Sequence, residues 1–597
     1  MCKIKKITVL ILLLVILAYT GYASYNNNWR DKVSPILLER LQNNKNDFFL
    51  IYLNKQTILE DRNLEKNKKA QLAYEQLIKE NYYSQDEIVN ILIRQNYSYK
   101  RYYLVNCVLV YGDIKIVSIL ADRRDVAYIS YDSPVFDNSI LDDTQEQLNS
   151  NIITWGIKSI KADSVWNLGF TGQNVVIGGQ DTGYDWTHPA LKTKYRGYIN
   201  DNEAQHSYSW HDAIHEISLL HNDSIIDPSN NPCGLDIIVP CDDQNHGTHT
   251  MGTMLGSTDS LSIGVSPDSK WIGCRNMERG WGKPSTYIEC FEWFLAPTDI
   301  NGINPDPTKA PDVINNSWGC PLIEGCDPTN WEYMELALNN LRASGVFIVV
   351  SAGNDGIRNC GSVNDPPAMF ERSFSVGALR QFLDTLSNNY IDTIASFSSR
   401  GPVIVDNSYR LKPDISAPGQ GVLSCIPYNR YQYSSGTSMA GPHVAGVVAL
   451  ILSANPELKG NTDLIEEILI NSAVQKWNSD TCRNEPEPVY PNSIYGYGKL
   501  NALYAINEAI KYNSEKNINK ESALITIFPN PVLNELNIIS ELDLVNYNLS
   551  VYSQIGKLIL KQKYNNQPIS TTQLLSGIYY IRLEKGGNVI SKKMIKM

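Results

Sequence analysis

Long runs of like charge are absent from this sequence, and only 19% of its 597 residues are charged. Lys and Arg together number 52 against 63 Asp and Glu, which leaves a formal net charge of −11. Because a nucleic-acid surface needs clustered positive charge, we do not expect nucleic acid as a partner. The hydrophobic content of 43% is too high for a disordered chain. At about 100 to 200 residues per domain, the length predicts three or more folded units.

Apolar runs long enough to span a bilayer, about 20 residues, are also missing. The longest run after the N-terminus, residues 444–454, has the length of a buried core helix. At the N-terminus, three lysines precede an apolar run over residues 7–18 and a small-x-small cleavage pattern at 21–23. This order predicts a signal peptide over residues 1–23, and therefore export. The alternative, an uncleaved anchor helix, needs a longer apolar run.

Cysteine pairs with the CxxC spacing of zinc ribbons and fingers are absent, which disfavours a structural zinc site. Of the 11 cysteines, Cys2 lies in the predicted signal peptide and Cys107 in a segment that we expect to be removed, so at least one of the remainder is unpaired. Export permits disulfides, although the full connectivity stays open. Two pairs are close enough in sequence to close short loops: Cys233 with Cys241, and Cys320 with Cys326.

The N-terminal part of the chain predicts a small α+β module. Residues 61–96 are polar with helical spacing, and the apolar run 102–110 predicts a strand. A helix over 113–121 and a strand over 126–130 follow. The polar, turn-rich stretch 139–151 comes next and is an easy place for proteolytic cleavage.

Farther along, short apolar strands alternate with helices, as in an α/β domain with a parallel sheet. Three of these strands end in small or polar residues: 175–177 leads to Asp181, 313–314 leads to 315–317, and 346–350 leads to 351–354. Ligands of open α/β sheets bind outside the carboxyl ends of the strands. We therefore expect the functional residues to gather at these ends.

The C-terminal region has a different pattern. A polar linker, 513–522, precedes a region of short strands separated by turn residues. At least five such strands in a short region predict a small β-sandwich rather than a second catalytic unit. The expected strands cover 533–539, 549–552, 558–560 and 578–583, with one more strand at the end of the chain.

Four short segments carry groups suited to acyl transfer, in the order Asp, His, Asn, Ser. A Ser hydroxyl is a weak nucleophile at neutral pH, so it needs an imidazole to take its proton and a carboxylate to orient that imidazole. Ser438 precedes an apolar segment, 444–452, that predicts a buried helix whose N-terminal N–H groups favour an anion. The segments are Asp181-Thr182-Gly183, His246-Gly247-Thr248-His249, Ser351-Ala352-Gly353-Asn354 and Gly436-Thr437-Ser438-Met439-Ala440.

Taken singly, each segment has a simpler explanation. An Asp-Thr-Gly tripeptide also occurs in aspartic proteases, which need a second carboxylate, and the sequence has no second copy. His246 and His249 lie three apart, whereas a metalloprotease helix places its histidines four apart with a Glu between them, and Gly247 disfavours a helix start. Ser438 alone is most simply a helix N-cap, and Asn354 a turn residue.

Taken together, the segments resemble those of subtilisin-type serine proteases (subtilases, peptidase family S8), most similar to the bacillopeptidase F-like group. The resemblance covers about residues 155–454 and implies an α/β catalytic domain with a parallel sheet flanked by helices. It departs from the family pattern at Gly441, where Ala is common; because this position touches the helix start, we expect little effect on the chemistry. Further matching segments are 188–191, 315–319, 397–402 and 412–419.

The resemblance implies a role for each site residue. Asp181 would orient His246, and His246 would act as base and then acid while Ser438 attacks the peptide carbonyl. Asn354 and the Ser438 N–H would stabilise the oxyanion. Two strands would bind the substrate backbone through Ser317, Trp318, Gly319, Ser351, Ala352 and Gly353. No metal ligand or required cofactor is predicted; the family often carries structural calcium, which cannot be read from this sequence.

The flanking regions also resemble known parts of such proteases. Residues 24–148 resemble an inhibitory propeptide, 149–512 the peptidase domain, and 523–597 the C-terminal sorting domain of the type IX secretion pathway. A retained binding domain is the alternative for the first region, and a carbohydrate- or cell-wall-binding sandwich for the last. The partners predicted are protein or peptide substrates, the chain's own propeptide and secretion machinery, for a monomer that is secreted or at the surface of a bacterial cell.

The sequence therefore predicts a secreted serine endopeptidase, made as a zymogen, that hydrolyses peptide bonds through an acyl-enzyme. One alternative is a pseudoprotease that binds peptides without cutting them. A lipase or esterase would need G-x-S-x-G, and residues 436–440 lack the last glycine. By the same resemblance, 364–368 aligns near the floor of the first specificity pocket, where Asp365 would attract a basic P1 side chain.

Overall fold

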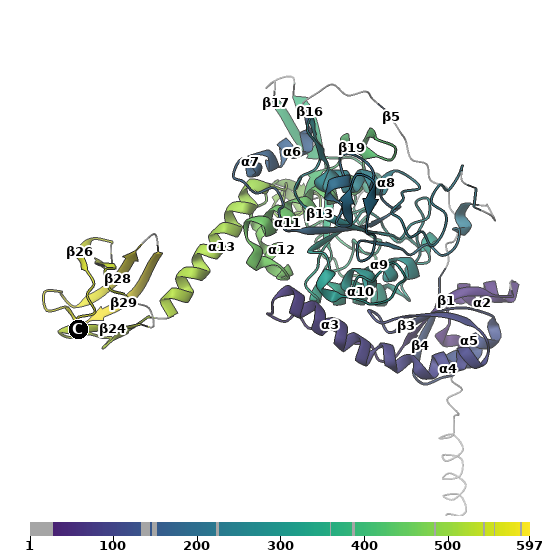
Figure 1. The fold of residues 1–597 in the computed structure, drawn as a ribbon, viewed down its shortest axis with the longest axis horizontal. Coiled ribbons are helices and arrows are strands. Elements are labelled where there is room, and N and C mark those ends of the chain that lie inside the picture. Colours follow the sequence, from purple (N-terminus) through teal and green to yellow (C-terminus); the bar gives the residue numbers. More distant parts are fainter. Residues whose placement is uncertain are drawn as a thin grey trace, which may run out of the picture. The chain divides into compact units, whose positions relative to one another are not determined.

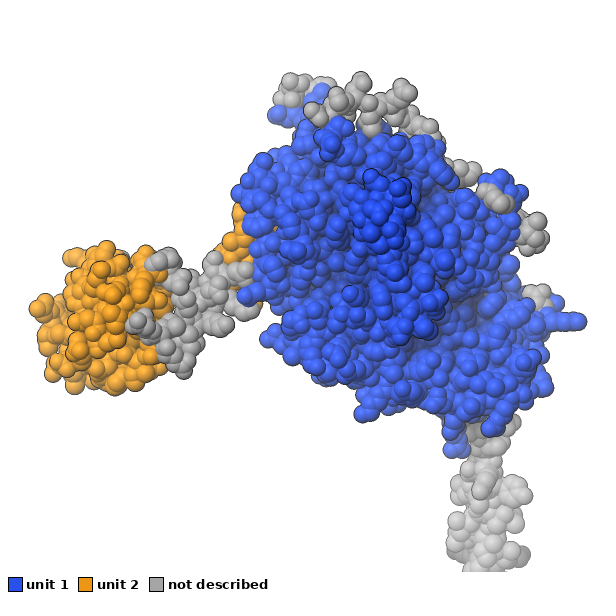
Figure 2. All heavy atoms as spheres, viewed as in Figure 1, with its two compact units in different colours: residues 1–503 blue, residues 504–597 orange. Residues whose placement is uncertain are grey.

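The computed structural model of the chain divides into two compact units, residues 1–503 and 504–597 (Figure 2). The predicted signal peptide lies outside the described residues, as does most of the stretch 139–151. The described residues are 28–43, 45–132, 144–145, 152–221, 226–227, 229–358, 360–384, 389–480, 482, 485–523, 525–540, 544–554, 556–585 and 588–597.

The N-terminal module is an antiparallel sheet covered by helices. Its strand β1 (Asp47–Leu53) is buried on both faces, because alternate residues point to opposite sides. Phe49 and Ile51 pack under the module's own helices, whereas Leu50 and Tyr52 join the core of the peptidase region. The sheet order is β2 (Ser98–Tyr102), β3 (Cys107–Gly112), β1 and β4 (Val126–Tyr131), with helices α2 (Pro35–Asn43), α3 (Lys66–Glu80), α4 (Asp86–Arg94) and α5 (Ile114–Ala121).

The single strand predicted over residues 102–110 was wrong. The chain turns between Tyr102 and Cys107. The strand before this turn, β2, and the strand after it, β3, pair in antiparallel orientation. Asn106 stabilises the turn by donating from Nδ2 to the carbonyl of Lys55 and the hydroxyl of Ser84. The apolar residues of the turn are buried against the peptidase region, which is why the run reads as a continuous strand.

The peptidase region contains a twisted, mainly parallel sheet, as predicted. Strand β15 is buried throughout, as expected of a parallel strand covered on both faces. The last pair of strands, β16 and β17, is antiparallel. In spatial order the strands are β10 (Trp210–Asp212), β13 (Lys270–Arg275), β7 (Val176–Asp181), β14 (Val313–Asn316), β15 (Phe347–Ser351), β16 (Phe374–Asp384) and β17 (Asn389–Ile394), with β18 (Ile415–Pro418) also paired to β16.

Helices cover both faces of this sheet (Figure 1). Helices α9 (Pro284–Leu295) and α10 (Trp331–Ala343) lie on the side of the N-terminal module and share its apolar core. Helix α11 (Thr437–Ala454) packs on β14, β15 and the neighbouring helix α8 (His246–Leu255). Among the described residues, α11 is long and apolar enough to cross a membrane, but 83% of it is buried inside the unit. It is the buried core helix that the sequence predicts.

Shorter elements surround this core. Helix α12 (Thr462–Asn471) follows α11, and two short helices, α6 (Trp155–Ser159) and α7 (Ala162–Trp166), precede β7. The minor sheets are β11 (Ser257–Thr258), β12 (Leu261–Ser262) and β6 (Ile152–Ile153); β19 (Val422–Ile426), β20 (Arg430–Ser434) and β5 (Thr144–Gln145); β21 (Asn478–Asp480) and β22 (Glu485–Val489); and β8 (Tyr198–Asn200) and β9 (Glu203–Ala204).

The second unit is the predicted β-sandwich. Apolar residues of both sheets, including Leu536, Val551 and Ile581, form its core. The predicted linker 513–522 lies within helix α13 (Ala502–Ala523), so this part of the chain is helical. The sheets are β23 (Ile525–Phe528), β24 (Glu535–Ser540) and β27 (Ile569–Ser570), and β26 (Leu558–Lys563), β25 (Asn548–Ser553), β28 (Gly577–Lys585) and β29 (Asn588–Lys596).

Four disulfides are formed, including both pairs expected from short sequence spacing. Among the described residues, the free cysteines are Cys107 and Cys425, and both are buried. The bonds are Cys233–Cys241, Cys274–Cys290, Cys320–Cys326 and Cys360–Cys482.

The disulfides differ widely in loop length, which leads to a prediction about stability. Cys360–Cys482 closes a separation of 122 residues, whereas Cys320–Cys326 closes one of 6. Because a longer closed loop restricts the unfolded chain more, replacing both cysteines by Ser should cost about 5 kcal/mol of unfolding free energy at the first pair and about 2 kcal/mol at the second. Urea unfolding of a Ser438→Ala background measures both. Equal losses at the two pairs would contradict the prediction.

Candidate active site

Asp181 is the last residue of β7 and is fully buried. Its Oδ1 accepts hydrogen bonds from the Thr182 N–H at 2.8 Å and from Nδ1 of His246 at 2.7 Å. Its Oδ2 accepts a longer bond, 3.3 Å, from the Thr250 hydroxyl. The carboxylate is therefore held in one orientation and sets which nitrogen of His246 faces it.

His246 is the first residue of α8. The prediction that Gly247 disfavours a helix start here was therefore wrong. Asn245, in the left-handed conformation with φ of 75°, precedes the helix. Gly247 has a separate reason to be glycine: a Cβ there would lie 2.0 Å from the carbonyl oxygen of Gly183. The close approach of α8 to the turn after Asp181 is what lets His246 reach that carboxylate.

Ser438 lies in the first turn of α11, where the N-cap position belongs to Gly436. The simpler explanation for Ser438 taken alone, a helix N-cap, was wrong, because the residue lies inside the helix. Its hydroxyl donates to the carbonyl oxygen of Ser317 at 3.2 Å, and the Ser317 hydroxyl donates to the carbonyl oxygen of Ser438 at 2.8 Å. This reciprocal contact joins the end of β14 to the start of α11.

Asn354 follows β15 in the loop that faces the same turn of α11. Its Oδ1 accepts from the N–H and the hydroxyl of Thr437, at 2.9 and 3.1 Å. The oxygen is thereby fixed on the protein, and the Nδ2 donors are left for another partner. Thr437 also accepts a bond from the Gly353 N–H at 3.2 Å. The sequence analysis did not single out Thr437, although it is adjacent to Ser438.

A pocket of about 80 Å³ brings most of the predicted residues together. Its Trp318 wall stacks on Tyr287, with ring centroids 3.8 Å apart. Asp365 also lines the pocket, and a Cβ at Gly319 would lie 3.7 Å from the Asp365 Cβ. The lining includes Ser317, Trp318, Gly319, Ser351, Ala352, Gly353, Asn354, Thr437 and Ser438, with Ser362, Asn364, Asp365 and Ala368. Asp181 and His246 are not among the residues that line this pocket; helix α8, which begins with His246, packs on α11, which carries Ser438.

Gly441, near the start of α11, also lies close to the side chain of Asn315. A Cβ at this position would lie 2.9 Å from Oδ1 of Asn315. Nδ2 of Asn315 donates to the Ser317 hydroxyl at 2.8 Å, which in turn contacts Ser438. A larger residue at 441 would therefore press on the hydrogen-bond chain behind Ser438.

Two opposing effects act on the protonation of His246. Burial disfavours the charged ring, but the charge of Asp181, its hydrogen bond and the charge of Asp242 raise the pKa of His246 above its ordinary value. The neighbouring His249 is fully buried, and burial lowers its pKa to about 3. Of these two histidines, only His246 is placed to exchange a proton near neutral pH.

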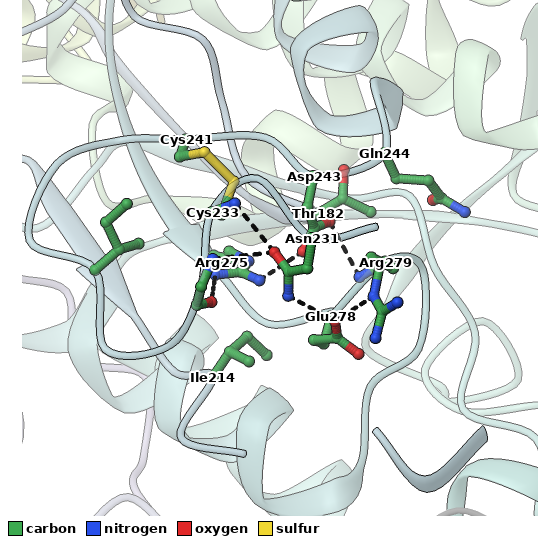
Figure 3. Close-up of polar contacts among 12 residues, drawn as sticks. Thr182, Ile214, Asn231, Cys233, Cys241, Asp243, Gln244, Arg275, Glu278 and Arg279 are labelled. Carbon is green, nitrogen blue, oxygen red and sulfur yellow. Dashed lines mark hydrogen bonds and ion pairs between the residues drawn. A yellow bond between two sulfur atoms is a disulfide. The ribbon is translucent and has the colours of Figure 1, made fainter. Parts of the chain in front are cut away.

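A buried polar network holds the chain that leads to His246 (Figure 3). Arg275, at the end of β13 and the register partner of Asp181, pairs with Asp243 at 2.5 Å. The same guanidinium donates to the carbonyl of Gly234, inside the loop closed by the Cys233–Cys241 disulfide. Sequence reasoning missed this network because its members are scattered between residues 212 and 279.

The structure thus combines a mainly parallel α/β sheet with a buried aspartate–histidine pair and a serine in the first turn of a buried helix. The chain belongs to the subtilase family, whose model matches residues 172–498. The model of a secretion system C-terminal sorting domain matches residues 526–597. The chain is thus a subtilase-family serine endopeptidase, a hydrolase, with a sorting domain that indicates secretion or attachment at a bacterial cell surface.

Several characterised relatives are similar over the peptidase region. Bacillopeptidase F of Bacillus subtilis (strain 168) is 37% identical over 364 residues, which is 60% of this chain and 22% of that protein. Serine protease AprX of the same organism is 34% identical over 281 residues, 44% of this chain and 58% of the relative. Subtilisin of Bacillus pumilus is 30% identical over 305 residues, 51% of this chain and 86% of the relative.

The buried histidines lead to a prediction about acid stability. Burial lowers the pKa of His443 to about 4, against about 6.5 for a free histidine. The unfolded chain therefore binds a proton that the folded chain does not, so this residue lowers the free energy of unfolding as pH falls from about 6.5 to about 4. His443→Gln should flatten that decline by up to about 1.4 kcal/mol per pH unit.

Urea unfolding at a series of pH values, in a Ser438→Ala background that prevents self-digestion, measures this difference. Carboxylates contribute equally to both proteins, so the comparison isolates His443. Parallel pH curves for the two proteins would contradict the assignment of a neutral, buried ring.

Proposed function

We propose that this protein is a secreted endopeptidase, made as a zymogen, that hydrolyses peptide bonds through an acyl-enzyme on Ser438. The observation that carries the proposal is the 2.7 Å hydrogen bond between Asp181 and Nδ1 of His246. It leaves Nε2 of His246 as the basic nitrogen, which is the arrangement that a serine nucleophile requires. The family membership of residues 172–498 supports the same chemistry.

In the proposed first step, the Ser438 hydroxyl turns from Ser317 toward Nε2 of His246 and attacks the carbonyl carbon of the peptide. His246 takes the hydroxyl proton, and the carbonyl oxygen becomes an oxyanion that accepts from Asn354 Nδ2 and the Ser438 N–H. His246 then gives the proton to the leaving amine as the C–N bond breaks. Water, deprotonated by His246, hydrolyses the resulting ester. The steps use side chains and water only, so they require no cofactor; structural calcium stays a prediction.

Two strand ends are proposed to hold the substrate. Residues 317–319 and 351–353 both line the pocket that contains Ser438. An extended peptide lying between them would pair through its backbone with a segment on each side. Such pairing gives main-chain recognition with little dependence on sequence. Side-chain selection would then depend on the pocket itself.

The N-terminal module is proposed to act as the inhibitory propeptide of a monomeric zymogen. It contacts the peptidase region through a buried ion pair of Lys66 with Asp312 at 2.8 Å, and through an ion pair between exposed Lys100 and buried Glu289 at 2.5 Å. Glu292 of α9 accepts from the N–H of Leu104 at 2.8 Å. A module attached so closely to α9 and α10 would direct the chain that follows it toward the catalytic region.

A Ser438→Ala variant tests the nucleophile and self-processing together. We expect loss of fluorophosphonate labelling, loss of casein hydrolysis, and retention of the N-terminal module in the secreted form, because the alanine has no hydroxyl to acylate. Intact mass and N-terminal sequencing identify the form. The matched control is Ser435→Ala, which removes an exposed hydroxyl three residues away and should leave labelling and maturation unchanged.

Two outcomes would contradict the proposal. Labelling that persists in Ser438→Ala would place the nucleophile elsewhere, and an unlabelled wild-type enzyme that still binds peptides would favour the pseudoprotease. Normal maturation of an inactive Ser438→Ala variant would mean that another protease removes the module.

The pocket suggests a preference for a basic P1 side chain, carried by Asp365. An Asp365→Asn variant should lose that preference, with kcat/KM for Lys or Arg substrates falling about tenfold while Phe and Leu substrates change little, since only the charge-assisted contact is removed. Cleavage profiling of a peptide library measures it. Residues 125–157 contain no Lys or Arg, so a strict basic preference would also require another protease to cut there. A wild-type profile without Lys or Arg enrichment would contradict the hypothesis.

A further inference from the structure

A second buried carboxylate, Asp242, lies behind the Asp181–His246 pair. It precedes His246 by four residues in the chain and is only 6% exposed. Asp242 forms an isolated β-bridge with Gly183, which places the chain leading to His246 against the turn that follows Asp181. A Cβ at Gly183 would lie 1.7 Å from the carbonyl oxygen of Cys241, and its φ is 108°, so this close approach requires glycine.

The carboxylate of Asp242 accepts five hydrogen bonds, three from backbone N–H groups and two from threonine hydroxyls. Its Oδ1 receives the Thr182 hydroxyl at 2.7 Å and the N–H groups of Gln244 and Asn245, each at 3.0 Å. Its Oδ2 receives both the N–H of Thr248, at 2.9 Å, and the Thr248 hydroxyl, at 2.6 Å. An ionised carboxylate is an acceptor only, and these contacts supply the donors that it needs. These donors favour the ionised carboxylate, whereas burial raises the pKa of Asp242 above its ordinary value.

The hydrogen bonds of Asp242 connect the two catalytic segments. Thr182, whose N–H binds Asp181, donates its hydroxyl to Asp242 and accepts the N–H of Gly247 at 3.0 Å. Thr248 belongs to the first turn of α8, the turn that begins with His246. One carboxylate thus fixes the residue after Asp181 and the residues on both sides of His246. A negative charge at this helix N-terminus is also stabilised by the helix dipole.

We propose that Asp242 is a positioning residue for the catalytic pair. Its carboxylate fixes the first turn of α8 against the Thr182 turn and so keeps His246 within hydrogen-bond distance of Asp181. Its negative charge also stabilises the imidazolium that forms when His246 takes the Ser438 proton. The inference rests on the proposed function, in which His246 is the general base.

The charges around His246 are few and can be named. Asp181 faces it from the end of β7 and Asp242 from the preceding loop, and both raise its pKa against the effect of burial. His249, one turn farther along α8, is neutral because burial lowers its pKa to about 3. Asp243, next to Asp242, is paired with Arg275 at 2.5 Å. Asp242 is therefore the second anion that acts on the His246 ring.

The test compares Asp242→Asn with Asp185→Asn in the full chain, matured to the active enzyme. Asp185 is a matched control because the change removes the same charge close by, from a carboxylate that binds Thr187 and the Tyr428 N–H instead of the catalytic turn. The readouts are kcat and KM for a peptide substrate, the pH dependence of kcat/KM, and the unfolding midpoint of each variant.

We expect Asp242→Asn to lower kcat about 10- to 100-fold with little change in KM, because the His246 ring is misplaced by a fraction of an ångström. Removing a negative charge makes the imidazolium less stable and lowers the pKa of His246. The unprotonated base then persists to lower pH, so the acid limb of the pH profile should move to lower pH. Asp185→Asn should stay within about twofold of the wild type with an unmoved acid limb.

If Asp242→Asn does not fold, a milder pair decides the question. Thr248→Val removes the hydroxyl that donates to Asp242 and accepts the Asp185 N–H, but it keeps the charge of Asp242, so kcat should fall several-fold with the acid limb unmoved, and Thr248→Ser should restore kcat. A folded Asp242→Asn with normal kcat and pH profile, or a Thr248→Val variant with normal kcat, would overturn the inference. If Asp242→Asn lowers kcat but leaves the acid limb of the pH profile unmoved, the proposed stabilisation of the imidazolium by the Asp242 charge would be overturned.

Asp181→Asn separates this inference from the proposed function. That variant should be inactive by about 10⁴-fold in kcat if His246 is the base. If Asp181→Asn is inactive and Asp242→Asn is normal, only the role of Asp242 fails. If Asp181→Asn is fully active, the proposed function fails as well.

Discussion

The hydrogen bond between Asp181 and His246 depends on the close backbone contact between the turn after β7 and the start of α8. Asp181 ends a central strand, and His246 begins a helix that approaches the turn after that strand so closely that Gly183 and Gly247 cannot carry a side chain. Asp242, Thr182 and Thr248 fill the contact with buried hydrogen bonds. The geometry that a proton transfer needs is thus supplied by backbone packing together with these side-chain hydrogen bonds.

The same principle extends to Ser438. Helix α11 is buried along most of its length, so its first turn cannot shift without disturbing the core. Ser317 then contacts the backbone of Ser438, and Thr437 fixes the side chain of Asn354, the proposed oxyanion donor. Helix α8, which begins with His246, packs on α11, which carries Ser438. Outside the site, buried ion pairs such as Lys66–Asp312 attach the N-terminal module to the peptidase region, while the second unit carries the sorting function.

The sequence predicted the features that depend on local chemistry. Strands β7, β14 and β15 and the buried helix after Ser438 were predicted, and so were five C-terminal strands, whereas β23 and β27 were not. Features that depend on tertiary contacts were missed. The turn at 103–106 looks like a strand because the peptidase region buries its apolar residues. Gly247 looks like a helix breaker because nothing local indicates the close approach to Gly183. Asp242, Arg275 and the long-range Cys360–Cys482 bond become visible only when distant segments meet.

A crystal structure of the enzyme inactivated by a fluorophosphonate tests the central claim most directly. The account predicts phosphorus bonded to Ser438 Oγ, a phosphonyl oxygen within about 3 Å of both Asn354 Nδ2 and the Ser438 N–H, and Nε2 of His246 within about 3.2 Å of Ser438 Oγ. His246 Nδ1 should still contact Asp181. An adduct on another residue, or a phosphonyl oxygen directed away from Asn354 into solvent, would contradict the account.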